Sequence, residues 1–244
     1  MRENAAFEAC AAMVRKADPD RYFSALFAPA GKRPFLLALY AFNVELARVG
    51  ASVREPMMGE IRLQWWRETL EGARAGKTRT HDVARVLAET FADVELPAAL
   101  FDAMVDARAF DFLEGTFTDA ESRDAYLDAT SANLMRLAAR VLGAGDRFDD
   151  LAREAGLAYG LAGLLRNHAT GSARAMLDET GIAPALRDAK EHLDRARRFK
   201  KPGTALAAFL PAALVRLYLH NPAKDIPIHR RQIGLLSASL RGRI

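Results

Sequence analysis

The side chains that most often carry catalysis or bind metals are few and scattered in this sequence. Cys10 is the single cysteine, so no internal disulfide or CxxC metal pair can form, and no basic neighbour favours a reactive thiolate. Among the five histidines, His81 and His168 have no metal-binding partner three or four residues away. We therefore interpret these residues as ordinary polar or packing residues.

Two arginines are better candidates, because a guanidinium group binds phosphate or carboxylate without a metal. Arg48 and Arg166 could each hold an anionic head group or form a structural ion pair, for which Glu45 is a candidate partner. Upstream of Arg48, Arg33 and Tyr40 fit packing and capping roles, with ligand binding as the alternative. A structural role is the simpler interpretation of all four.

Carboxylates that could bind a divalent cation are missing from the two segments that carry these arginines. Glu45 is the sole acid in residues 36–53, and residues 155–177 contain none. Magnesium prefers oxygen ligands and is commonly held through carboxylates. The sequence therefore predicts no metal site and no cofactor in these segments.

The elements that position these residues are predicted to be helices throughout. Half of the 244 residues are hydrophobic and 27% are charged, and no period-two alternation is present. No repeat or linker divides the chain, so we expect a single all-α domain over residues 1–244, a bundle of about ten helices. Helical periodicity predicts segments at 4–16, 21–29, 31–53, 58–76, 80–92, 97–115, 120–142, 149–168, 184–199, 203–219 and 227–240.

Some residues predict how these helices begin, end and pack. The apolar residues within 36–44 nearly surround their helix axis, so this helix should be buried on most sides. Gly156, Gly160 and Gly163 lie on one helix and either allow close helix packing or widen a cavity. Helix starts are predicted at Pro97, Pro184, Pro202 and Pro227, and helix exits at Gly143, Gly145 and Gly181.

Charge is distributed unevenly along the chain, although the net charge is only +4. Residues 187–244 carry 13 Lys/Arg against 4 Asp/Glu, whereas the remaining residues carry 22 against 27. These charges line solvated helix faces, or they form a basic end that meets an anionic membrane or an acidic protein partner. No aromatic platform accompanies them, so no nucleic-acid partner is expected. The apolar run 204–215 is too short to span a bilayer, and no secretory signal is predicted.

Three stretches resemble the squalene/phytoene synthase family in order and spacing. They are DRYFSALFAPAGKRPFLLALYAF (20–42), DARAFDFLEGTFTDAESRDAYLDATSANLMRLAARVLG (106–143) and AGLAYGLAGLLRNHATG (155–171). The resemblance implies the all-α isoprenoid-synthase fold with a central cavity. It also implies head-to-head prenyltransferase chemistry, in which paired aspartates on two facing helices hold magnesium ions and a prenyl diphosphate.

This sequence departs from the family at the positions that hold the metal. The motif-defining polar residues are replaced by Ala47, Arg48 and Ala51 on the first helix and by Gly160, Gly163, Asn167 and Gly171 on the second. The residues that match the family are Arg33, Tyr40 and Arg166. The comparison implies that the magnesium–diphosphate site is lost and that Arg48 stands where cations would sit. The candidate ligand or pocket residues that remain are Arg33, Tyr40, Arg48, Arg166 and Asn167.

The stretch RLQWWRE (62–68) resembles a degenerate branch of this family that includes a mitochondrial assembly factor for respiratory complex I. Trp65 and Trp66 point about 100° apart on a helix, so one should lie in the core and the other near the surface. The leading hypothesis is a non-catalytic protein that assists complex I assembly by binding a subunit or a lipid. The alternatives are a magnesium-dependent prenyltransferase and an isoprenoid or lipid carrier. We expect a cytoplasmic protein, or one peripheral to the inner membrane, on the matrix side if mitochondrial.

Overall fold

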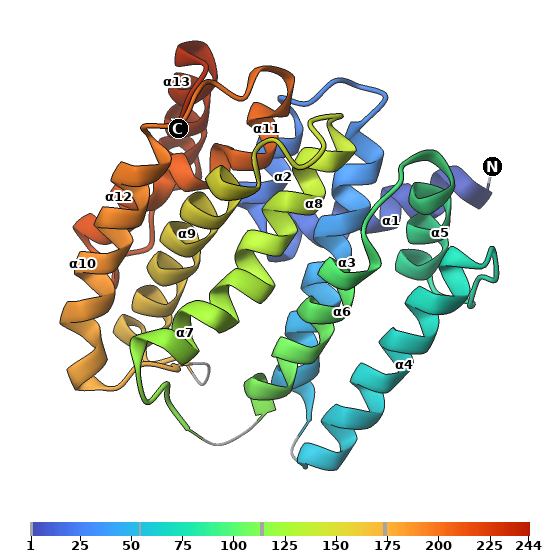
Figure 1. Ribbon diagram of the computed structural model, residues 1–244, viewed down its shortest axis with the longest axis horizontal. Coiled ribbons are helices and arrows are strands. Elements are labelled where there is room, and N and C mark those ends of the chain that lie inside the picture. Colours follow the sequence, from blue (N-terminus) through green and yellow to red (C-terminus); the bar gives the residue numbers. More distant parts are fainter. Residues whose placement is uncertain (1, 54, 113–114, 173–174) are drawn as a thin grey trace.

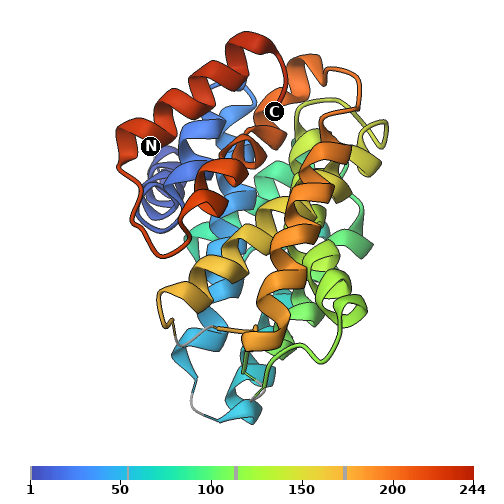
Figure 2. The same cartoon turned by 90° about the vertical axis from the view of Figure 1, so that its left-hand side faces the viewer.

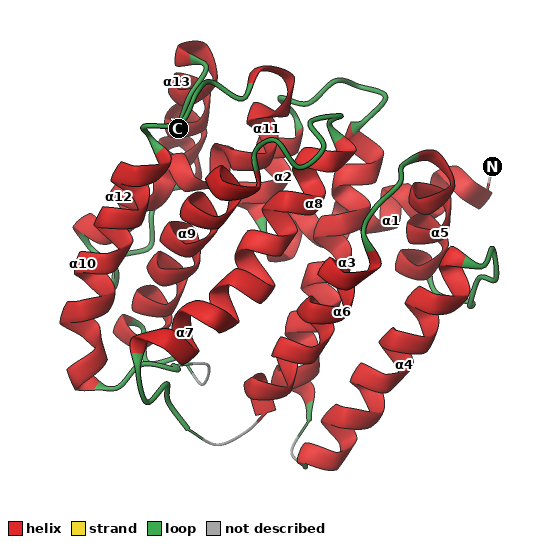
Figure 3. Cartoon of the chain, viewed as in Figure 1, coloured by secondary structure: helices red, strands yellow, loops and turns green. Residues whose placement is uncertain are grey.

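Helices make up all the regular structure in residues 2–53, 55–112, 115–172 and 175–244, which the computed structural model describes (Figure 1). In the first half of the chain they are α1 (Arg2–Ala17), α2 (Pro19–Ala25), α3 (Arg33–Ser52), α4 (Pro56–Arg74), α5 (Asp82–Asp93), α6 (Ala98–Ala107) and η1 (Arg108–Phe112). In the second half they are α7 (Ala120–Leu127), η2 (Asp128–Ala132), α8 (Asn133–Val141), α9 (Asp149–Ala169), α10 (Glu179–Ala196), η3 (Gly203–Ala205), α11 (Leu206–Phe209), η4 (Leu210–Leu214), α12 (Val215–His220) and α13 (Ile228–Arg241). Figure 3 shows no strand among these residues, which confirms the predicted all-α class.

α3 is the helix around which the N-terminal half of the molecule packs. All of its residues from 36 to 44 are buried, so the prediction of burial on most sides is confirmed. α1, α2, α5, α8 and η1 all contact it. Because α8 also contacts α9, it joins α3 and α9, the two helices that carry the positions resembling the aspartate motifs (Figure 1).

Three segments that were predicted as single helices are interrupted. The segment predicted at 97–115 contains α6 followed by the tighter 3-10 turn η1, and its residues 113–114 lie outside those that the structure describes. The segment 120–142 contains the π-helical turn η2 between α7 and α8. The segment 203–219 is divided into four short pieces around Pro211. Proline has no N–H and its ring excludes a regular α-helix at that point. The chain stays helical through η1 and η2, so apolar periodicity alone does not reveal these two interruptions.

Two predicted helix boundaries are wrong. Pro184 lies inside α10 instead of at its start, and Gly181 lies in the first turn of α10 instead of at a helix exit. α10 begins earlier because Oδ1 of Asp178 accepts a hydrogen bond from the Gly181 N–H at 2.8 Å, which caps the helix. Gly143 and Gly145 do have positive φ, at 81° and 59°, as expected after a helix end.

Two helical segments, Arg33–Ser52 and Gly203–His220, are long and apolar enough to cross a membrane by length and composition. In each, 56% of the most apolar window is buried inside the molecule. Packing within the bundle therefore accounts for much of their apolar character.

Candidate functional site

The positions on α3 that resemble the first aspartate motif, Ala47, Arg48 and Ala51, offer no carboxylate. Ala47 is half-buried and Ala51 is exposed, and neither offers a polar group. Nη1 of Arg48 lies 2.8 Å from Oε1 of Glu45, three residues earlier on the same helix. Both charged residues line a pocket of about 390 Å³ that reaches α4. The expectation that Arg48 stands where cations would sit in the family stays a prediction.

Aromatic rings form the α4 side of this pocket. Trp66 is buried and Trp65 is half-buried, as predicted for neighbouring residues on one helix. Their ring centroids lie 4.9 Å apart in a T-shaped arrangement, and the His81 ring lies 5.4 Å from that of Trp66. These contacts join α4 to the start of α5. The histidine and the tryptophans therefore have packing roles that need no ligand.

The three glycines of α9 have different surroundings. A Cβ on Gly156 would lie 2.4 Å from the Cα of Ala132, and one on Gly160 would lie 2.7 Å from Cδ2 of Leu127. Both glycines thus let α9 pack directly against α7 and η2, which was one of the two predicted roles. Gly163 is exposed, and a Cβ there would meet nothing within 4 Å.

The positions that resemble the second aspartate motif lie at the C-terminal end of α9. Asn167 is half-buried, and its main-chain oxygen accepts a hydrogen bond from Oγ1 of Thr170 at 3.3 Å. Gly171 has φ 63°, the left-handed conformation that commonly follows a helix end. The guanidinium of Arg166 lies 4.3 Å from the ring centroid of Tyr218, a cation–π contact. This end of α9 offers no carboxylate to a metal ion.

Tyr40 and Arg33 make the contacts of packing and capping residues. The Tyr40 side chain is 1% exposed, and its hydroxyl is without a hydrogen-bond partner among the described residues. Burial raises the pKa of this phenol, so it stays protonated. Nη2 of Arg33 donates to the main-chain oxygens of Leu26 and Ala28, at 3.0 and 3.3 Å, and so caps the end of α2.

Asp20 is a buried carboxylate that sequence analysis missed. Its Oδ2 accepts hydrogen bonds from the hydroxyls of Tyr159, at 3.1 Å, and Tyr218. Its Oδ1 accepts one from Nη1 of Arg231 at 3.0 Å. Burial, and then the nearby Asp20 charge, raise the pKa of both tyrosines, so both remain donors. The network joins α2, α9, α12 and α13.

A second polar network, centred on Arg108, was also missed. Nη1 of Arg108 donates to Oδ2 of Asp111 and to the hydroxyl of Tyr126, both at 3.0 Å, and Nη2 donates to Oδ1 of Asn43 at 3.2 Å. The Tyr126 hydroxyl donates to Oδ1 of Asp111 at 2.6 Å. η1 is thereby fixed to α3 and α7. The spacing of Arg108 and Asp111, three residues apart, was the available signal.

The carboxylates near these segments do not fit a magnesium–diphosphate site. Glu45, Asp20 and Asp111 are each paired with an arginine. In the part of the chain that the structure describes, no group of three or more His, Cys, Asp or Glu side chains is placed to hold a metal ion. Cys10 is buried, and burial raises the pKa of its thiol to about 12, which disfavours a nucleophilic thiolate. His168 is also occupied structurally, with Nδ1 3.0 Å from the main-chain oxygen of Leu177. These side chains therefore make structural contacts within the bundle.

Two solved structures have the same fold. A dehydrosqualene synthase in complex with ligand superposes with a TM-score of 0.74 at 15% identity, covering 98% of this chain and 97% of that chain. Squalene synthase HpnC from Alicyclobacillus acidocaldarius gives a TM-score of 0.69 at 20% identity, covering 99% and 95%. These likenesses confirm the isoprenoid-synthase fold. The central cavity expected with it stays a prediction.

Curated relatives are similar over a shorter segment. NADH dehydrogenase (ubiquinone) complex I, assembly factor 6 of Homo sapiens is 31% identical over 158 residues, 64% of this chain and 47% of that protein. The homologue of that factor from Dictyostelium discoideum is 24% identical over 86% of this chain and 68% of that protein. The chain spans about half the length of the mammalian relatives it matches. Residues 14–177, more than half of the chain, match the family profile described as squalene/phytoene synthase. This chain therefore belongs to the squalene/phytoene synthase family.

Proposed function

We propose that this protein is a non-catalytic member of the family that acts in the assembly of respiratory complex I. Relatives from Homo sapiens, Dictyostelium discoideum and Drosophila melanogaster are named as complex I assembly factor 6 or its homologue. Family membership alone leaves the activity open, because one fold supports many functions. The residues on α3 and α9 support the non-catalytic role.

The observation that carries the proposal is the position of Glu45. It is the sole acid in residues 36–53, and it pairs with Arg48 in a pocket formed with α4. Residues 155–177 contain no acid at all. Removing one partner from a buried charge pair costs about 3–5 kcal/mol. A metal site that loses several carboxylates should therefore lose more binding free energy than the removal of one partner costs. Magnesium-dependent binding of a diphosphate is not supported by such a donor set.

The partner in this role is a respiratory-complex subunit or a lipid. The protein would work at the inner membrane that holds the complex, from the cytoplasmic or matrix side. The 13 Lys/Arg against 4 Asp/Glu in residues 187–244 support peripheral contact with an anionic membrane. No nucleic acid and no cofactor enters the proposal.

Deletion of the gene in its source organism tests the assembly role. We expect complex I content and NADH-linked respiration to fall, while succinate-linked respiration is unchanged. Expression of the wild-type protein should restore both quantities. Expression of Glu45→Gln should restore them equally well, because the proposed role does not use this carboxylate. Unchanged complex I content in the deletion strain would contradict the assembly role, and a stable Glu45→Gln protein that fails to restore complex I would contradict the statement that this role does not use Glu45.

A further inference from the structure

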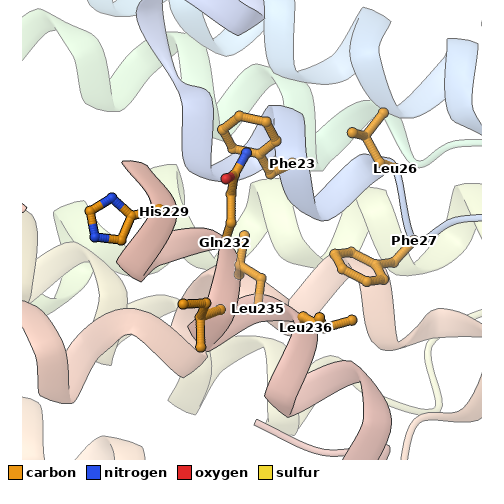
Figure 4. Close-up of a pocket in the computed structure, with 8 residues that line it drawn as sticks. Phe23, Leu26, Phe27, His229, Gln232, Leu235 and Leu236 are labelled. Carbon is orange, nitrogen blue, oxygen red and sulfur yellow. The ribbon is translucent and has the colours of Figure 1, made fainter. Parts of the chain in front are cut away.

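An apolar groove of about 360 Å³ lies between α2 and α13. Figure 4 shows Phe23, Leu26 and Phe27 on the α2 side of this groove and Leu235 and Leu236 on the α13 side. Leu26 and Phe27 are 42% and 40% exposed, so the groove presents apolar surface to solvent. Figure 2 shows α13 along its length at the top of the molecule.

α13 also leaves large apolar side chains exposed to solvent, and two of them, Ile233 and Leu236, line this groove. Ile233, Leu236 and Leu240 recur at helical spacing and are 63%, 50% and 81% exposed, whereas Leu235 is fully buried. Among the described residues, seven of the ten exposed large apolar side chains lie on α13, directly after α2, or at Phe199. Scattered apolar residues are ordinary on a protein surface, but a contiguous cluster marks an interaction site.

A basic cavity of about 810 Å³ adjoins the C-terminal end of α13. None of its lining side chains is acidic, and its charged lining residues are Arg147, Arg198, Lys200 and Lys201. The cavity and the helix end are neighbours, because a Cβ at Gly242 would lie 3.5 Å from Cδ of Lys201.

Further cations gather at the same end of the molecule. Burial, and then repulsion from neighbouring guanidinium groups, lower the pKa of Arg197. The arginines that repel it are Arg216, Arg241 and Arg243, and Asp194 is the acid that acts in the opposite direction. Exposed apolar side chains of α13 and a cluster of cationic side chains thus lie near one another at the C-terminal end of α13.

We infer that the surface formed by α13, the α2–α13 groove and residues 197–204 docks on an anionic phospholipid bilayer. Such a bilayer matches both parts of the surface, because its acyl region accepts the apolar side chains and its phosphates accept the cations. A second copy of this chain would bring two basic ends together, which like-charge repulsion opposes. An acidic soluble protein would match the cations but would also have to cover the exposed apolar residues of α13.

This inference rests on the membrane contact within the proposed function, and the assembly role does not enter into it. Cosedimentation of the purified full-length protein with vesicles separates the two, because no respiratory complex is present. We expect binding to vesicles of phosphatidylcholine mixed with phosphatidylglycerol, with weaker binding as the salt concentration rises. Vesicles of phosphatidylcholine alone should not bind the protein.

Substitutions of exposed residues locate the binding surface without disturbing the core. The double variant Ile233→Glu/Leu240→Glu should bind anionic vesicles at least about tenfold more weakly. The reason is that burial of one large apolar side chain raises the affinity about tenfold or more. Its matched control is Met57→Glu/Ile61→Glu on α4, where both side chains are also more than half exposed. This control should bind as the wild type does.

Lys201→Glu should weaken binding to anionic vesicles about fivefold or more, as expected for a cation near an anionic surface. The exposed Lys77 provides the control variant Lys77→Glu, which should bind as the wild type does.

Three results would overturn the inference: no binding to anionic vesicles, equal binding to both vesicle types, or equal losses in test and control variants. Sedimentation velocity adds a fourth. A wild-type dimer that Ile233→Glu/Leu240→Glu converts to a monomer would assign this surface to contact between two copies.

Discussion

Gly156 and Gly163 have the same residue type on α9 but opposite surroundings. A Cβ on Gly156 would lie 2.4 Å from Cα and 2.7 Å from N of Ala132, which are backbone atoms that cannot rotate away. Gly156→Ala should therefore lower the free energy of unfolding by about 1–3 kcal/mol through overpacking. Gly163→Ala should raise it by about 0.5–1 kcal/mol, because alanine favours the helix and the site is open.

Urea unfolding of the two variants and the wild type measures both effects, and the comparison controls for the change from glycine to alanine. Effects of opposite sign are expected. If Gly156→Ala were neutral or stabilising, the close contact between α9 and η2 would be contradicted.

How far single residues could be predicted depends on the separation of their partners in the chain. Arg48 and Glu45 are three residues apart, so their pairing was predictable from the helical spacing. Asp20 is bonded to Tyr159 and Arg231, which are 139 and 211 residues away. No local pattern indicates such contacts, so Asp20 was not predicted.

Long helices with continuous apolar patterns were predicted well. α9 was expected at 149–168 and spans Asp149–Ala169, and α5 was expected at 80–92 and spans Asp82–Asp93. The errors concern elements whose ends are set by single side chains or by contacts with other helices. The start of α10 is set by Asp178, and η1 is held against α3 by Arg108.

Glu154 connects α9 to α10 and should make the stability of this pair depend on pH. Its Oε2 lies 2.7 Å from Nδ1 of His192 and accepts a hydrogen bond from Nε of Arg195 at 2.8 Å. Burial alone would raise the pKa of Glu154, but the hydrogen bonds from Arg195 and His192 outweigh it, so the pKa is lowered from its ordinary 4.5. A carboxylate with a lowered pKa in the folded state stabilises the protein above the pKa of the unfolded state.

This contribution is therefore present at neutral pH and is lost as the pH falls below about 4.5 and through the folded-state pKa. In Glu154→Gln the decrease in stability on acidification should be smaller than in the wild type, because this proton uptake is absent. Urea unfolding at a series of pH values between neutral and acid measures the difference. An unchanged pH dependence in the variant would contradict the assigned role, and Glu121→Gln, an exposed residue, is the control.

The architecture of the protein was predictable because composition, periodicity and family resemblance agree on one all-α fold. The uneven charge along the chain was also visible in the sequence. The sequence did not show that the basic residues lie near exposed apolar residues of α13. Leu235 and Leu236 are neighbours in the sequence, and only the packing of α13 on the bundle makes the first buried and the second exposed. The arrangement of α3 and α9 likewise needed the structure to show that Glu45 faces α4.

Release of diphosphate is the measurement that most directly tests whether a synthase fold serves a non-catalytic role here. Purified protein is incubated with farnesyl or geranylgeranyl diphosphate and magnesium, and diphosphate is assayed against a no-protein control. We expect no release above that control, because α3 and α9 do not supply the carboxylates that magnesium requires. Release that grows with protein concentration and stops on addition of a chelator would contradict the account and favour a prenyltransferase.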